Sequence, residues 1–395
     1  MPVELLFGTV VLLLPVAAFS GWYLGRREGH RGAARSGRPV HMSPDYLKGL
    51  NYLLNEQPDK AIEVFIRVLQ VDDETVETHF ALGNLFRRRG EVDRAIRIHQ
   101  NLIARPTLDP EQRALALLEL GVDYMRSGLL DRAESLFVEL LDGGVYRRAA
   151  LTRLVDIYQQ EKDWQKAIDY VLLLKRETGQ DVSSMHAQFI CEQADELSSA
   201  GDVDGSRKLL KRALQTDSKC VRASLGLGSI EMSSGQFRHA IDHFKRVEGQ
   251  NHDFIPEIIA PLITCYRSID RIEDLVSYLE QLSSLYAGVS PVLALAQLAL
   301  EQDGVDSARA LMVEELRVRP TIRGVDRLID YSLSTASGDA RNNLGLLKEF
   351  TQKLLDNKST YKCAACGFSG RTLHWHCPSC KMWNSIKPIQ GIEGE

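Results

Sequence analysis

The sequence predicts an all-α protein that begins with an apolar segment and ends with a cysteine-rich one. Small residues recur every 33 to 39 positions through the middle of the chain, and four of the seven cysteines fall within the last 33 residues. A chain of 395 residues with 44% hydrophobic and 26% charged residues is folded, and it is too long for one ordinary core. Two or more structural units are therefore expected.

The first element is expected to be a transmembrane anchor over residues 1–25. Leu5 to Leu24 form an uncharged run of twenty residues. As a helix this run would span ~30 Å, the thickness of the hydrocarbon core of a bilayer. Trp22 and Tyr23 lie at its end, where aromatic rings favour the headgroup level.

The second element, residues 26–44, is a basic linker that sets the expected orientation. It carries Arg26, Arg27, Arg31, Arg35 and Arg38. Because basic flanks stay in the cytoplasm, we expect a single-pass inner-membrane protein whose C-terminal body is cytoplasmic. A cleaved signal peptide and a buried helix are the alternatives. A signal peptide would carry positive charge before the apolar run rather than after it.

Residues 45–357 are expected to form an array of about eight or nine helical hairpins. The recurring small residues stand 34, 38, 34, 39, 34, 35 and 33 positions apart. This is the period of tetratricopeptide repeats, which stack into a right-handed superhelix. Another antiparallel helical array with an accidental period is the alternative. The eight positions are Ala61, Ala95, Ala133, Ala167, Ser206, Ala240, Leu275 and Ala308.

Other positions of the repeat fit the same spacing. Phe65, Phe137 and Phe244 each come four positions after the small residue of their repeat. The small residue and the phenylalanine of one repeat therefore lie on the same helix face. Glycines such as Gly90 and Gly128 fall where the first helix must end. A groove for a protein partner is predicted beside the early glycines of the first helices, where a solvated helix end is the alternative. Its candidate residues are Asn84, Arg87, Arg88, Met125 and Arg126.

The last element, residues 358–395, is expected to bind a metal through Cys363, Cys366, Cys377 and Cys380. Two C-x2-C pairs separated by ten residues supply four thiolates, enough to close a tetrahedral shell. Such a shell leaves no open position, so a structural role is favoured over hydrolysis. Zinc and iron both accept tetrahedral thiolates, so the metal is left open. Two disulfides are the alternative, which a cytoplasmic location disfavours.

The remaining candidates receive structural interpretations. His374 and His376 lie between the cysteine pairs and are expected to pack or face solvent rather than bind metal. Trp375 and Trp383 are expected to shield the metal from water. The other cysteines, Cys191, Cys220 and Cys265, are expected to be small thiols within the repeats.

Composition and motifs argue against two classes of function. The net charge of −5 gives no global basic field, so nucleic acid is not the expected partner. No phosphate loop, nucleophile elbow or H-E-x-x-H motif is found, so we do not expect an enzyme. Homo-oligomerisation is left open.

The chain resembles the lipopolysaccharide assembly protein B family of Gram-negative bacteria over essentially its whole length. Three stretches carry the resemblance: residues 13–23, residues 83–100, and residues 375–380 with Ile386-Lys387-Pro388-Ile389. It implies a cytoplasm-facing inner-membrane protein with tetratricopeptide repeats and a rubredoxin-like metal domain. The family's metal ligands match the four C-terminal cysteines.

The resemblance also implies a function and partners. Members are understood to couple a membrane-bound ATP-dependent zinc metalloprotease to the deacetylase that commits precursors to lipid A. The expected function is therefore that of an adaptor that promotes proteolysis of the deacetylase and so regulates lipopolysaccharide biosynthesis. The alternative is a rubredoxin-like electron-transfer component on a repeat scaffold.

Overall fold

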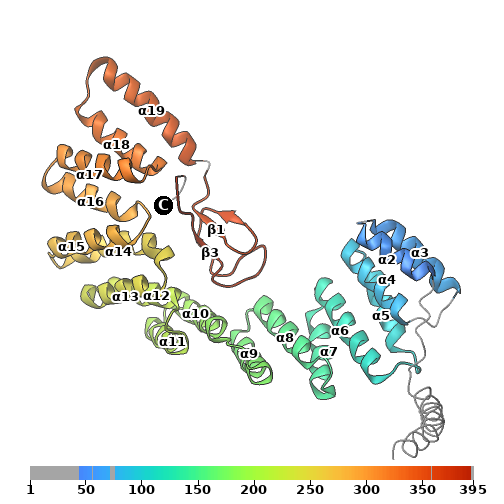
Figure 1. The fold of residues 1–395 in the computed structure, drawn as a ribbon. Coiled ribbons are helices and arrows are strands. Elements are labelled where there is room, and N and C mark those ends of the chain that lie inside the picture. Colours follow the sequence, from blue (N-terminus) through green and yellow to red (C-terminus); the bar gives the residue numbers. More distant parts are fainter. Residues whose placement is uncertain (1–43, 56, 72–75, 357, 393–395) are drawn as a thin grey trace, which may run out of the picture. The chain divides into compact units, whose positions relative to one another are not determined.

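The computed structural model describes residues 44–392 except 56, 72–75 and 357 (Figure 1). The predicted anchor, residues 1–25, lies outside the described residues, as does nearly all of the linker 26–44. Over the part of the chain that the structure describes, no helix combines the length and apolar character needed to cross a bilayer.

The described chain is mostly helical, as the sequence predicts. Successive helices are joined by short turns, and a single 3-10 turn, η1 (His252–Phe254), precedes α14. The α-helices are α2 (Pro44–Leu54), α3 (Pro58–Val71), α4 (Val76–Arg89), α5 (Val92–Ile103), α6 (Pro110–Arg126), α7 (Leu130–Gly143), α8 (Arg147–Glu161), α9 (Trp164–Thr178), α10 (Ser183–Ser199), α11 (Val203–Thr216), α12 (Val221–Ser233), α13 (Phe237–Gln250), α14 (Ile255–Ser268), α15 (Ile272–Leu285), α16 (Ser290–Gln302), α17 (Val305–Val318), α18 (Ile322–Thr335) and α19 (Gly338–Asp356).

The helices alternate between a first and a second helix of each repeat. All eight recurring small residues lie on second helices, the odd-numbered ones from α3 to α17, and none is more than 1% exposed. Seven of the eight are Ala or Ser, the small side chains that let the two helices of a hairpin approach closely, and Leu275 is the eighth. The predicted repeat is therefore confirmed, and α18 with α19 continues it as a further, less regular hairpin.

Close packing between the two helices explains the early glycines. A Cβ atom on Gly49 would lie 2.6 Å from the Phe65 ring, and one on Gly228 would lie 2.5 Å from the Phe244 ring. The second helix thus places its aromatic side chain directly on the backbone of the first. At the turn between the helices, Gly90 and Gly128 have φ values of 87° and 78°, which glycine adopts without strain.

The chain divides into two compact units, which we describe separately. In the first unit, up to Leu129, an ionic network ties α4 to α6. Asp123 is fully buried, and its carboxylate contacts Arg87 at 2.8 Å and His99 Nδ1 at 2.5 Å. Glu119 also contacts Arg87, at 2.5 Å. Each charge is compensated by a neighbour, which is what allows an aspartate to lie in this core.

The second unit, from Leu130 onward, contains the other repeats and the C-terminal domain. That domain is a three-stranded antiparallel sheet with the order β2-β1-β3. The strands are β1 (Tyr361–Cys363), β2 (Ser369–Gly370) and β3 (Ile386–Pro388). Cys363 pairs with Ile386 across β1 and β3. The hydrophobic cluster of the domain itself contains only three buried residues, Cys363, Cys377 and Ile386, too few to stabilise the domain by burial alone.

Candidate metal centre

The structure brings the four predicted cysteines together. Their sulfur atoms all lie within 4.8 Å of one another. Cys363 and Cys380 are 3.7 Å apart, and so are Cys366 and Cys377. With metal–sulfur bonds of about 2.3 Å, the edge of a tetrahedron is about 3.8 Å, which is close to the separations of these two pairs, so the four thiols can share one ion. All four are free cysteines, which is contrary to the disulfide alternative.

Two similar turns place the sulfurs. In the first, the Gly367 amide donates to the Cys363 carbonyl at 3.0 Å, and in the second the Lys381 amide donates to the Cys377 carbonyl at 3.0 Å. Gly367 and Lys381 occupy the same place in the two turns, and their φ values are 78° and 60°. The left-handed residue lets each chain turn back so that both sulfurs of a pair point inward.

Hydrogen bonds around the sulfurs distinguish the four thiols. The bond between Cys363 and the Ser385 hydroxyl, 3.3 Å long, lowers the pKa of Cys363 to about 6. The backbone N–H of Phe368 lowers the pKa of Cys366. The backbone N–H of Met382 favours the Cys380 thiolate, but burial and the neighbouring thiols raise the pKa of Cys380 to about 11. Bound metal would supply the positive charge that holds all four as thiolates.

The intervening histidines do not belong to the sulfur cluster. His374 Nε2 lies 3.0 Å from the Thr372 hydroxyl, and His376 Nε2 lies 2.8 Å from the Lys381 carbonyl. His376 also stacks on Trp383, with ring centroids 4.4 Å apart. Both histidines therefore have the packing and surface roles that the sequence analysis expects.

The two tryptophans contact the repeats, an interaction that the sequence did not predict. Trp383 meets Trp164 and Phe189 edge to face, with centroid distances of 6.4 and 5.7 Å. Its indole N–H donates to Gln159 at 2.7 Å. Next to it, the Asn384 side chain donates to the Ser184 hydroxyl at 2.9 Å. The turn that carries Cys377 and Cys380 is therefore held against α8, α9 and α10.

Other contacts extend this interface to later repeats. Trp375 stacks on Phe254 with centroids 5.4 Å apart, and it packs against a hydrophobic core cluster of the repeats. The Tyr361 hydroxyl donates to Glu257 at 2.7 Å. Lys387 pairs with Asp253 at 2.7 Å. No local pattern in the sequence predicts this interface, because the residues that meet are between 104 and 224 positions apart along the chain.

The predicted partner residues separate into two kinds. Arg87 is held by Glu119 and Asp123, and it also contacts Asn84, so it stabilises the first unit. Arg88 and Arg126 are exposed, and Met125 is half-buried. Of the predicted basic side chains, Arg88 and Arg126 are therefore the ones available to a partner.

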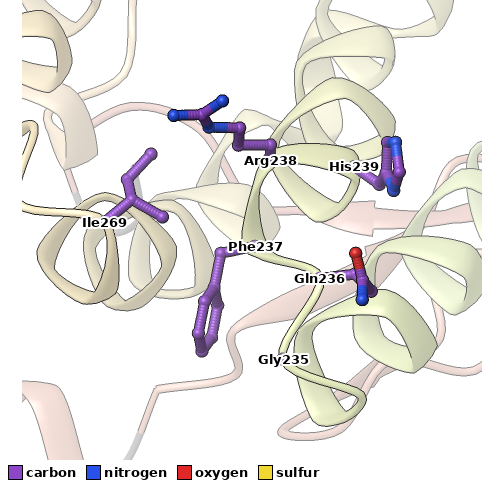
Figure 2. Close-up of a pocket in the computed structure, with 6 residues that line it drawn as sticks. All are labelled: Gly235, Gln236, Phe237, Arg238, His239 and Ile269. Atoms are coloured by element: carbon purple, nitrogen blue, oxygen red, sulfur yellow. The ribbon is translucent and has the colours of Figure 1, made fainter.

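Two hollows among the described residues differ in the side chains that line them. The cavity in Figure 2, of about 290 Å³, lies at the turn between α12 and α13 beside Ile269. Its polar side chains are those of Gln236, Arg238 and His239, without a carboxylate or a nucleophile. A second hollow of about 540 Å³ is lined by α15, α16 and α17 and carries several carboxylates, among them Glu280 and Asp303.

Family models match both parts of the chain. The rubredoxin metal binding domain matches residues 361–388, the segment that holds the four sulfurs. Tetratricopeptide repeat models match residues 78–114, 118–182 and 191–253. A solved tetratricopeptide repeat protein from Parabacteroides merdae is 15% identical over 70% of this chain and 98% of its own, with a TM-score of 0.32.

Full-length relatives decide the family. The chain is 40% identical to lipopolysaccharide assembly protein B of Escherichia coli K12 over 393 residues, 99% of both chains. The chain belongs to the lipopolysaccharide assembly protein B family. Another member, from Haemophilus influenzae, is 36% identical over 400 residues. Membership supports a role in lipopolysaccharide assembly, carried out by a repeat scaffold with one tetrathiolate site.

Proposed function

We propose that this protein is an inner-membrane adaptor that regulates lipopolysaccharide biosynthesis. It would present the lipid A-committing deacetylase to a membrane-bound ATP-dependent zinc metalloprotease and so promote degradation of the deacetylase. The observation that carries the proposal is full-length membership of the lipopolysaccharide assembly protein B family. The roles of protease and deacetylase come from the family resemblance.

The architecture supports a binding role rather than a catalytic one. Tetratricopeptide arrays offer an extended surface on which partners bind, and the tetrathiolate site has the ligand set of a structural metal. The metal domain is fixed across α8 to α14 by aromatic contacts, hydrogen bonds and an ion pair. An adaptor needs such rigidity, because two partners bound to a flexible chain would not be held in a defined arrangement.

Exposed apolar side chains supply surface for such partners. On α19, Leu346, Leu347, Phe350 and Leu354 are each between 51% and 56% exposed. The terminal helix of a repeat array usually presents a polar outer face, because nothing follows to cover it. Apolar side chains at this place are typical of a surface that contacts another macromolecule.

Anchoring of residues 1–25 is part of the proposal, with the body on the cytoplasmic side. Confinement to one membrane raises the effective concentration of partners that share it. A reporter that is active only in the periplasm, fused after residue 395, should remain inactive. Strong activity of that fusion would overturn the proposed orientation.

Co-purification tests the adaptor role. The tagged full-length protein, solubilised from membranes, should retain both the metalloprotease and the deacetylase, identified by mass. A chain that begins at Asp45 should retain less of both after equal expression. Capture of neither partner by the intact chain would contradict the proposal, and a redox partner in their place would favour the electron-transfer alternative.

A further inference from the structure

Two buried cysteines outside the metal domain lie in contact. Cys191 is on α10, and Cys220 immediately precedes α12 in the next repeat. Their sulfur atoms are 3.8 Å apart, and the two residues are 0% and 1% exposed. The third cysteine of the second unit's repeats, Cys265, is equally buried, within a cluster of aliphatic and aromatic side chains. It is therefore a matched reference for the reactivity of a buried thiol.

The surroundings make the two sulfurs unequal. Cys220 is the N-cap residue of α12, where the helix dipole favours negative charge. Its sulfur accepts from the Gln188 side chain at 3.6 Å and lies 3.8 Å from the Cys191 sulfur. The Cys191 bond and the backbone N–H of Ala223 lower the pKa of Cys220 against the effect of burial, while the same sulfur contact and burial raise the pKa of Cys191.

A buried arginine holds the two helices together beside this pair. Arg222, two residues beyond Cys220, is itself buried and pairs with Glu192 and Asp195 of α10. These ion pairs fix the start of α12 against α10, so the two cysteines are held face to face. A thiol of lowered pKa in contact with a thiol of raised pKa is the arrangement of an attacking and a resolving cysteine.

We propose that Cys191 and Cys220 form an oxidant-responsive pair that closes to a disulfide between neighbouring repeats when the protein meets hydrogen peroxide. The Cys220 thiolate and one proton react with peroxide to give a sulfenic acid and water. The Cys191 thiol then attacks the sulfenic sulfur, which releases a second water and forms the S–S bond. Peroxide is reduced, two thiols are oxidised, and a dithiol reductant reverses the change.

Formation of the bond has a structural consequence. A disulfide requires a sulfur–sulfur distance of about 2.05 Å, so the sulfurs must approach by about 1.8 Å from their present separation. α10 and α12 carry both cysteines and must absorb this movement. α10 also carries Ser184 and Phe189, which contact the metal domain. Disulfide formation therefore moves α10, one of the helices that hold the metal domain in place.

Peptide mapping tests the proposal on the metal-loaded, full-length protein. After treatment with hydrogen peroxide, free thiols are alkylated and the protein is digested with trypsin. The expected product is residues 177–207 joined to residues 220–222, lost on treatment with dithiothreitol. Because the cross-link is identified by its two peptides, oxidation of the four metal-binding cysteines does not obscure it.

Variants assign the roles of the two sulfurs. In Cys191→Ser, the sulfenic acid on Cys220 should persist and be trapped by dimedone, whereas in Cys220→Ser residue 191 should stay unmodified. Cys265→Ser should leave the cross-link unchanged. Within the unsubstituted protein, oxidation of Cys191 and Cys220 at the same slow rate as Cys265, without a cross-link, would overturn the proposal even where a variant fails to fold.

Discussion

Replacing Trp383 with alanine should release the metal domain from the repeats. The indole makes two edge-to-face contacts, with Trp164 and Phe189, and one hydrogen bond, to Gln159. Each aromatic pair contributes ~1 kcal/mol and the hydrogen bond ~1 kcal/mol, so the docked state should lose about 3 kcal/mol. Since 1.4 kcal/mol is a tenfold change, the population of the undocked state should rise about 100-fold.

Hydrogen exchange measured by mass spectrometry tests this prediction. Amides of residues 361–392 should exchange faster in Trp383→Ala, while α4 to α6 of the first unit keep their rates. Trp383→Phe is the matched control. It retains the ring contacts but loses the N–H that pairs with Gln159, and should show about a fivefold change for ~1 kcal/mol. The metal content of each variant is measured in parallel. Unchanged exchange in Trp383→Ala at full metal content would refute the reasoning.

Three further predictions concern packing, charge and metal. Gly228→Ala should destabilise the second unit by ~1–3 kcal/mol, because the new Cβ would lie 2.5 Å from Phe244. The control Gly249→Ala places its Cβ in open space and should not destabilise the unit, and thermal melts compare the two variants. Arg87→Ala should lower the free energy of unfolding of the first unit by ~3 kcal/mol, because buried Asp123 loses its arginine partner and keeps only His99. Arg88→Ala should leave the midpoint of urea unfolding unchanged, and equal midpoints for the two variants would contradict this prediction. Cys363→Ser should abolish metal binding and make residues 361–395 sensitive to protease, while the first unit stays protected. A C-terminal segment that is free of metal but resists protease would disprove the coupling of metal binding to folding.

The sequence predicts those parts of the structure that repeat or cluster along the chain. The buried small residues, such as Ala61 and Ala240, could be found because every hairpin needs one at the same place. The four metal-binding cysteines could be found because two ligands from one tight turn must be three positions apart. Both signals are local, and both are confirmed.

Contacts between distant segments leave no such signal. Trp383 packs on Phe189 of a distant repeat, and its position near Cys380 along the chain does not indicate this contact. Arg87 looks like a free basic residue at a helix end, but Asp123, one repeat later, holds it. The contact of Cys191 with Cys220 also depends on how consecutive first helices stack. In these three cases the contacts are set by tertiary packing, which cannot be inferred from residue propensity or from spacing along the chain.

The half-life of the lipid A-committing deacetylase tests the proposed function most directly. It is measured after translation is stopped, in cells that lack the native protein and are complemented by the intact chain, the chain from Asp45, or Cys363→Ser at matched levels. The adaptor account predicts a short half-life with the intact chain and a longer one with either variant or with none. A half-life that stays the same when the whole protein is depleted would contradict the account.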